Sequence, residues 1–145
     1  MANMIQGTSN VLTKQITFRP QSFTSTGAGV TCNLYPYGSN QISARLDVGA
    51  VNTLTSLAVK IQVSVDDSTW VDVSGATFTT VTAANAGETI DFFVPMASST
   101  TASPYIYVRA YATLTGTSAL ISCLIEGSTK MGATNAWSNS PPTNN

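Results

Sequence analysis

Histidine is absent from the 145-residue sequence, and cysteine occurs only twice. Zinc sites are built from several Cys and His side chains, so a site of that kind is excluded. Without an imidazole, the only catalytic scheme that the composition permits is general acid–base catalysis by paired carboxylates. We therefore predict no metal and no cofactor, and we expect a protein that is not an enzyme.

Charge is scarce as well. Only 9% of the residues are charged, the formal net charge is −1, and serine and threonine make up more than a quarter of the chain. A chain so close to neutrality lacks self-repulsion, which favours association with a partner or with itself. Nucleic-acid binding requires clustered basic side chains, so we predict no nucleic-acid partner. The six basic residues are scattered: Lys14, Arg19, Arg45, Lys60, Arg109 and Lys130.

Long apolar runs are also missing. No window approaches the roughly 20 apolar residues of a membrane-spanning helix. The first ten residues, MANMIQGTSN, have neither the basic start nor the apolar stretch of a signal peptide. We expect a protein that folds in a cytoplasm and has no membrane partner.

What the sequence does contain is alternation of apolar and polar residues. The alternation is clearest over residues 42–48, 57–65 and 105–114, where aliphatic side chains on one face oppose polar or aromatic ones on the other. This is the pattern of half-buried antiparallel strands. Weaker strand signals come from β-branched and aromatic residues. They cover residues 15–19, 28–35, 70–73, 77–82, 89–94 and 119–126.

Turn signals separate these segments, among them Asp66-Asp67-Ser68, Ser74-Gly75 and Thr115-Gly116-Thr117. No segment keeps a helical period for three turns, and the length suits one domain. We predict a single all-β sandwich of about eight antiparallel strands, with either jelly-roll or immunoglobulin-like topology.

The two ends differ from this body because they are polar and carry few apolar residues. We predict an N-terminal arm at 1–14, a β-sandwich domain at 15–127 and a C-terminal arm at 128–145. Segments of this composition do not bury enough apolar surface to fold alone, so the arms need a partner to become ordered. Met131 and Trp137 are the large apolar residues of the C-terminal arm and are interface candidates.

The two cysteines, Cys32 and Cys123, each stand among apolar residues with a spacing of two. Both are therefore predicted to point into the core. For a protein made in a cytoplasm, two reduced thiols are favoured over a disulfide between the sheets, which stays open as the alternative.

The stretch QVSVDDSTWVDVSG, residues 62–75, concentrates three aspartates in a chain poor in charge. Asp66 and Asp67 fall at a predicted hairpin tip, where Asp is common because its carboxylate accepts hydrogen bonds from nearby backbone amides. We favour a solvated turn over two alternatives, a calcium site and a catalytic carboxylate pair. A calcium cage needs more oxygen ligands at defined spacing than these two residues and Asp72 supply.

Aromatic side chains raise two further questions. Trp70 either covers the core or its edge, which we favour, or forms a platform for a sugar ring. Tyr105, Tyr107, Arg109 and Tyr111 lie opposite the aliphatic stripe of their strand. Tyrosine and arginine are enriched at protein interfaces, so this strip is the best interface candidate. A strand covered by one of the arms is the alternative.

Two longer phrases carry a resemblance: VDDSTWVDVSGATF, residues 65–78, and YIYVRAYATLTGTSALISCLIEG, residues 105–127. They resemble small structural proteins encoded beside the capsid genes of tailed bacteriophages, in particular head decoration or cement proteins. In those proteins a strand, an acidic turn and a tryptophan strand come before a Tyr-Val-Arg strand. Asp67 stands where such turns often carry glycine, which predicts a different turn type.

The resemblance implies a protein of the outer capsid surface, made in the host cytoplasm, that stabilises the shell by bridging subunits of the major capsid protein. It implies a homotrimer at local three-fold positions. The same sandwich is reused in tail and fibre proteins, so a tail structural component stays open. A carbohydrate-binding or host-attachment module, with Trp70 as its platform, is the other alternative.

Overall fold

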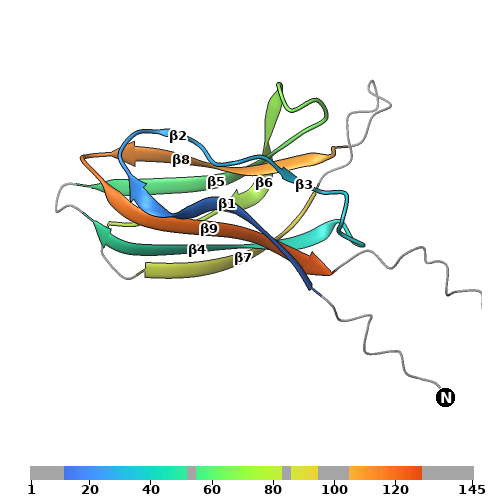
Figure 1. Cartoon of the computed structure of the whole chain (residues 1–145), viewed down its shortest axis with the longest axis horizontal. Helices are drawn as coiled ribbons and strands as arrows, with labels where there is room; N and C mark the ends of the chain where they lie inside the picture. Colours follow the sequence, from blue (N-terminus) through green and yellow to red (C-terminus); the bar gives the residue numbers. More distant parts are fainter. Residues whose placement is uncertain (1–11, 52–54, 83–85, 95–104, 129–145) are drawn as a thin grey trace, which may run out of the picture.

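The structure is a computed structural model, and it describes residues 12–51, 55–82, 86–94 and 105–128. Two β-sheets pack face to face in this part of the chain, and no helix is present in it (Figure 1). The predicted all-β sandwich is confirmed. Most of each arm, with Met131 and Trp137, lies outside the described residues.

The described residues form nine strands. In order they are β1 (Leu12–Phe23), β2 (Gly27–Ala28), β3 (Cys32–Asn33), β4 (Gln41–Val51), β5 (Ser56–Ser64), β6 (Trp70–Thr77), β7 (Ala86–Phe93), β8 (Tyr107–Thr115) and β9 (Ala119–Ser128). Residues 12–14 and 128, which were predicted to belong to the arms, are therefore part of strands β1 and β9.

The strand order distinguishes the two predicted topologies. Sheet A has the order β1-β9-β4-β7, and sheet B has the order β2-β8-β5-β6, with β3 also pairing with β8. The short β2 and β3 share one position beside β8, so each sheet has four strand positions and the chain crosses between sheets repeatedly. Eight positions in two four-stranded sheets correspond to a jelly roll, whereas the immunoglobulin arrangement divides seven to nine strands differently.

The core lies between the sheets and is built by the predicted alternation. The inward residues of β4, β5, β8 and β9 are almost completely buried, and each of the following is at most 2% exposed: Ile42, Leu46, Leu57, Val59, Ile61, Val63, Val108, Ile121 and Ile125. The polar partners in the alternation face outward. Burial of aliphatic surface is the dominant stabilising contribution in such a sandwich.

Both cysteines are free thiols in the core, as predicted. Burial raises the pKa of Cys32 to about 11 and that of Cys123 to about 12. The thiolate is the nucleophilic form of cysteine, so these side chains act as small apolar core residues and not as reactive groups.

Two predicted strand boundaries are wrong. Residues 28–35 do not form one strand, because only β2 and β3 pair with β8. The predicted turn at Ser74-Gly75 is a bulge inside β6, where Gln62 pairs with Asp72 but Lys60 pairs with Thr77. Gly75 has a positive φ of 78°, which glycine adopts without strain and which places the extra residues within the strand.

The predicted strand at 77–82 is also only partly present. After β6, residues 78–81 continue beside β5 through a hydrogen bond from Phe78 N to Val59 O at 2.9 Å and a bridge between Leu57 and Val81. They then cross towards β7. The segment is too irregular to count as a strand, although its backbone remains tied to sheet B.

Thr17 joins the two sheets along one side of the sandwich, and we call this contact the Thr17 seam. A bulge in β1 between Ile16 and Phe18 buries Thr17 completely. Its carbonyl accepts a hydrogen bond from Val30 N at 2.6 Å, and its Oγ1 donates to Val30 O at 3.0 Å. The same Oγ1 accepts from Ala110 N at 3.0 Å, which ties β1 of sheet A to β8 of sheet B.

The Thr17 seam leads to a stability prediction at Gly29. A Cβ added there would lie 2.3 Å from Thr17 O, a backbone atom that has no room to move away. We expect Gly29→Ala to lower the free energy of unfolding by about 3 kcal/mol, because the seam must open to admit the methyl group. Chemical denaturation followed by circular dichroism measures the loss.

Gly27→Ala is the matched control, because a Cβ at Gly27 meets nothing within 4 Å. This variant should stay within about 0.5 kcal/mol of the unmodified protein. Equal unfolding midpoints for the two variants would show that the seam is not a close-packed contact.

Candidate functional site

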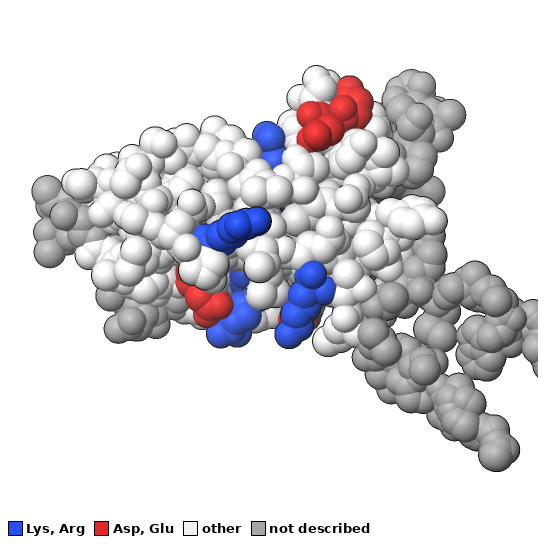
Figure 2. All heavy atoms as spheres, viewed as in Figure 1, with Lys and Arg blue, Asp and Glu red and all other residues white. Residues whose placement is uncertain are grey.

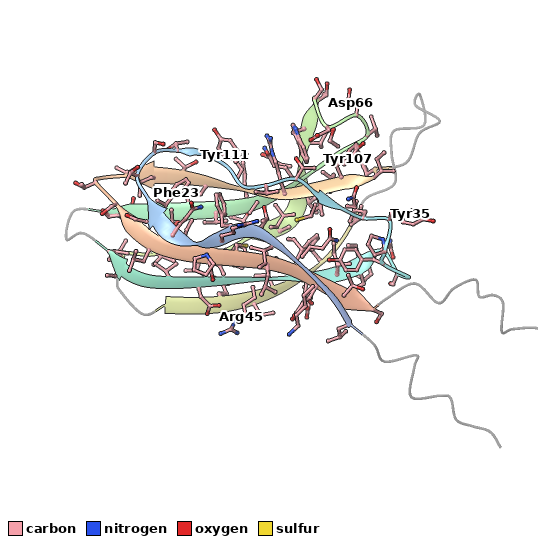
Figure 3. All side chains as sticks on the ribbon, viewed as in Figure 1. Phe23, Tyr35, Arg45, Asp66, Tyr107 and Tyr111 are labelled. Atoms are coloured by element: carbon pink, nitrogen blue, oxygen red, sulfur yellow. The ribbon has the colours of Figure 1, made fainter. Side chains whose placement is uncertain are left out.

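The outer face of sheet B gathers most of the side chains that the sequence singled out. The register places Gln62 opposite Arg109 and Lys60 opposite Tyr111, and it places Ser64 between Tyr107 and Trp70. Because these pairs share the polar face of β5, all of them point away from the core. Figure 3 shows Tyr107 and Tyr111 on the side of sheet B that faces away from sheet A, with Arg45 on the opposite side of the molecule.

Arg109 is the centre of this face. Its guanidinium carbon lies 4.0 Å from the centroid of the Trp70 ring and 5.9 Å from that of Tyr111. Its Nε donates a hydrogen bond to Gln62 Oε1 at 2.9 Å. Partial burial lowers the pKa of Arg109 from its usual value, against the raising effect of Asp67 and Tyr111. The guanidinium is therefore held over the tryptophan ring by contacts on several sides.

Asp72 and Lys60 complete a closed ring of contacts with Arg109. Gln62 Nε2 donates to Asp72 Oδ1 at 2.9 Å, and Lys60 Nζ donates to Asp72 Oδ2 at 2.7 Å. These hydrogen bonds, first that of Lys60 and then that of Gln62, lower the pKa of Asp72. The Lys60 ammonium also lies 5.7 Å from the centroid of Tyr111. We call this set the aromatic–ionic ring: Lys60, Gln62, Trp70, Asp72, Arg109 and Tyr111.

The hairpin tip between β5 and β6 is a capped turn. Asp66 Oδ1 accepts hydrogen bonds from Ser68 N at 2.9 Å and Thr69 N at 2.7 Å, and Ser64 Oγ donates to it at 3.0 Å. The two backbone hydrogen bonds, with Thr69 first, lower the pKa of Asp66. Asp67 has a φ of 58°, the left-handed conformation that glycine adopts, so the aspartate keeps the backbone conformation that glycine would take there. The prediction that Asp67 changes the turn type is therefore wrong at this residue.

The tip also contacts another part of the same chain. Thr31 Oγ1, in the connection between β2 and β3, donates a hydrogen bond to Asp67 Oδ1 at 2.8 Å. The β5–β6 hairpin therefore reaches across the outer side of β8, where Figure 3 shows Asp66 above Tyr107.

The three aspartates of the stretch do not converge on one point. Asp66 caps backbone amides, Asp67 accepts from Thr31, and Asp72 pairs with Lys60 and Gln62. No group of three or more His, Cys, Asp or Glu residues that could hold a metal ion occurs in the part of the chain that the structure describes. The arrangement is that of a solvated turn followed by an ion pair, which was the favoured interpretation of this stretch.

The aromatic predictions have mixed outcomes. Trp70 is half-buried on the outer face and is not part of the core, so the favoured core placement is wrong. Tyr105 is separated from the predicted strip, because it packs against the core while Ile106, assigned to the apolar stripe, is 39% exposed. Tyr107, Arg109 and Tyr111 do share one face.

Three members of the aromatic–ionic ring, Lys60, Gln62 and Asp72, were not predicted as parts of this surface, although Asp72 was considered as a calcium ligand. Lys60 and Gln62 belong to the polar side of the alternating segment 57–65, so the sequence placed them on the outer face. Nothing in the sequence indicated that Gln62, only 9% exposed, would link Arg109 to Asp72. That link depends on the strand register across three strands.

The charges elsewhere form no large patch. On the face shown in Figure 2 the lysine and arginine side chains stand apart from one another, and acidic side chains lie near several of them. On sheet A, Arg45 pairs with Asp47 at 2.9 Å and Lys14 with Glu126 at 3.9 Å. No helix long and apolar enough to span a membrane is found among the described residues.

Comparison with known proteins establishes the fold alone. No protein-family model matches the sequence, and no curated protein matches it. A chain in the structure of infectious bursal disease virus, Gx strain, has a TM-score of 0.52 and 14% identity over 84% of this chain, and the match spans only 32% of that longer chain. At this low identity the match shows a similar fold alone, and that fold agrees with the two-sheet architecture described above.

Two further structures are similar at lower TM-scores. A chain of cowpea mosaic virus top component, naturally occurring empty particles, has a TM-score of 0.44 and 17% identity over 81% of this chain and 82% of that chain. A chain of infectious bursal disease virus, Gt strain, has a TM-score of 0.41 and 14% identity, covering 86% of this chain and 34% of that one.

The capped turn predicts an acid dependence of stability. Because the folded-state pKa of Asp66 lies below its usual 3.8, its contribution is fully present above that pH and is lost as the pH falls through the lower folded value. We expect Asp66→Asn, which keeps an oxygen acceptor, to show a smaller loss of stability than the unmodified protein below about pH 4. Denaturation midpoints between about pH 2 and 6 test this, and parallel curves would contradict it.

The stacking of Arg109 on Trp70 predicts an energetic coupling. In a double-mutant cycle of Arg109→Met and Trp70→Leu, we expect the sum of the two single-variant losses in unfolding free energy to exceed the loss of the double variant by about 1 kcal/mol. Methionine keeps the length of the arginine side chain without its charge. Strictly additive losses would show that the stacking contributes nothing beyond separate packing.

Proposed function

We propose that this protein is a structural component of a virus particle, and more specifically a decoration or cement protein of a tailed-bacteriophage capsid. The observation that supports this most directly is the jelly-roll strand order, shared as a fold with a chain of infectious bursal disease virus. Jelly rolls occur in viral capsid proteins and in lectins. The bacteriophage assignment rests on the sequence phrases at 65–78 and 105–127.

In this proposal the outer face of sheet B is the contact surface, and the partner is the major capsid protein. Tyr107, Tyr111 and Trp70 are only partly buried there, and contacts with Arg109 hold Tyr111 and Trp70 within the aromatic–ionic ring. Aromatic and arginine side chains that are rigid before binding lose little entropy on docking. Repetition of one modest contact over a symmetric shell, for instance by a homotrimer, gives strong overall attachment.

The near-neutral charge supports a place on the outer capsid surface. Contact with packaged DNA favours clustered basic side chains, whereas the basic residues of this chain are scattered and several are paired with acids. The predicted absence of a catalytic centre fits the same role, because a cement protein acts by binding alone.

A carbohydrate-binding or host-attachment module is the second candidate, because jelly rolls also occur in lectins. Trp70 is partly exposed and lies beside Gln62 and Asp72, which could hydrogen-bond sugar hydroxyls. Against this, the Arg109 guanidinium occupies one face of the indole at 4.0 Å. A sugar ring would have to stack on the other face or displace Arg109.

Mixing the full-length protein with undecorated shells of the virus that encodes it tests the proposal. We expect the protein to sediment with the shells and to raise their melting temperature, because each bound copy ties neighbouring capsid subunits together. Tyr111→Ser should weaken co-sedimentation by about tenfold or more, since half-buried aromatic side chains are typical interface anchors.

Phe93→Ser is the matched control, because Phe93 is an exposed aromatic residue on sheet A, at 62% exposure. This variant should bind shells like the unmodified protein. An unchanged shell melting temperature with no protein in the pellet would refute the cement role. Binding to a glycan array that depends on Trp70 would support the second candidate.

A further inference from the structure

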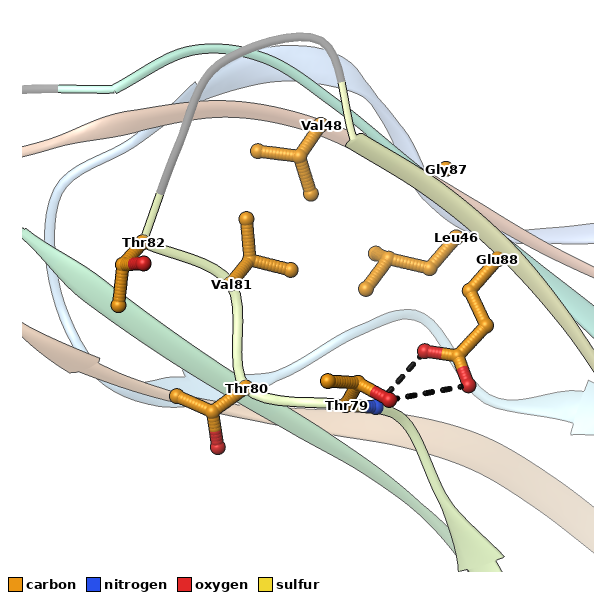
Figure 4. A pocket seen from close by; sticks show the side chains of 8 residues that line it. All are labelled: Leu46, Val48, Thr79, Thr80, Val81, Thr82, Gly87 and Glu88. Carbon is orange, nitrogen blue, oxygen red and sulfur yellow. Dashed lines mark hydrogen bonds between the residues drawn. The ribbon is translucent and has the colours of Figure 1, made fainter.

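A cavity of about 400 Å³ opens between the two sheets on the side opposite the Thr17 seam. Its floor is apolar and comes from both sheets: Leu46 and Val48 belong to β4, and Val81 is bridged to Leu57 of β5. These three floor residues are 1%, 2% and 9% exposed, so the cavity reaches the main core. Figure 4 shows Val81 pointing towards Val48 and Leu46 across it.

The two sides of the sandwich are joined differently. On the other side, hydrogen bonds through Thr17 connect the edges of the two sheets. On this side residues 78–81 stay paired with β5, and Thr79 reaches Glu88 of β7. Thr79 N donates to Glu88 Oε1 at 2.7 Å, and Thr79 Oγ1 donates to Glu88 Oε2 at 3.4 Å.

The mouth of the cavity is polar and carries one charge. Thr79, Thr80 and Thr82 line it, and Glu88 supplies a carboxylate that accepts two hydrogen bonds from Thr79 (Figure 4). None of the ion pairs formed among the described residues includes Glu88. An apolar floor with one oriented anionic group at the entrance complements a ligand that has an aliphatic chain and a cationic head.

We propose that this cavity binds a small cationic amphiphile, an alkyl ammonium compound whose chain fills the space between the sheets and whose head pairs with Glu88. The volume lies within the range of small-molecule sites. Apolar cavities of proteins remain dry and accept apolar ligands, because burying an alkyl chain there removes its surface from water. This proposal goes beyond the virion role and does not depend on it.

Isothermal titration calorimetry of the full-length protein with three probes of equal chain length tests the proposal. We expect decylamine to bind with a dissociation constant below about 1 mM, more tightly than decanol, and decanoate to bind most weakly because its charge meets that of Glu88. Glu88→Gln should weaken decylamine binding about threefold to tenfold and leave decanol binding unchanged.

Asp91→Asn is the matched control, because Asp91 lies on the same strand but pairs with Ser43 on the outer face of sheet A. It removes the same charge away from the cavity and should leave all three affinities unchanged. Val81→Phe, which fills the floor, should abolish binding of decylamine and decanol. If that variant does not fold, the proposal is tested by comparing the decylamine affinities of Glu88→Gln and Asp91→Asn.

Three results would overturn the proposal. The first is no binding of decylamine up to about 1 mM. The second is equal affinity for the three probes, which would exclude recognition of the head group. The third is an equal loss in Glu88→Gln and Asp91→Asn, which would indicate attraction by the overall charge of the protein and not by this carboxylate.

Discussion

The hydrogen bonds of Thr17 are the constraint on which the rest of the structure depends. A bulge in β1 removes this residue from the ladder of its own sheet, and its hydroxyl and carbonyl then pair with Val30 and Ala110 of the other layer. Because the side chain is fully buried, these partners satisfy polar groups that would otherwise be costly. The seam joins one pair of sheet edges, and at the opposite pair a hydrogen bond from Thr79 N to Glu88 Oε1 spans the two sheets beside the cavity.

On the outer face of sheet B, several of the few charged side chains of this protein contact one another and aromatic rings. Gln62 joins Asp72 to Arg109, and Lys60 pairs directly with Asp72. The two cations lie over aromatic rings, Lys60 over Tyr111 and Arg109 over Trp70, so these charges are held by contacts within the surface. The hairpin tip adds Asp67, which reaches back to Thr31. A surface that is ordered before it meets a partner suits a protein whose proposed function is repeated attachment to a regular shell.

Sequence alternation predicted β4, β5 and β8 well because these strands have one buried and one outer face. It failed where the backbone departs from a regular ladder. Gly29 interrupts the predicted strand 28–35 at the Thr17 seam, and Gly75 marks a bulge where the sequence indicated a turn. The placement of Trp70 failed for a different reason: its environment depends on the β5–β6 register, which brings it under Arg109, a residue 39 positions along the chain. Long-range register of this kind is not encoded in local periodicity.

Cryo-electron microscopy of the intact particle is the most direct test of the central claim, that this jelly roll is a virion structural protein attached through sheet B. We expect density for the two sheets at symmetry-related positions on the outside of the shell, with Tyr107 and Tyr111 facing a capsid subunit. Particles that lack this density on the head, or that carry the chain with sheet B exposed to solvent, would contradict it.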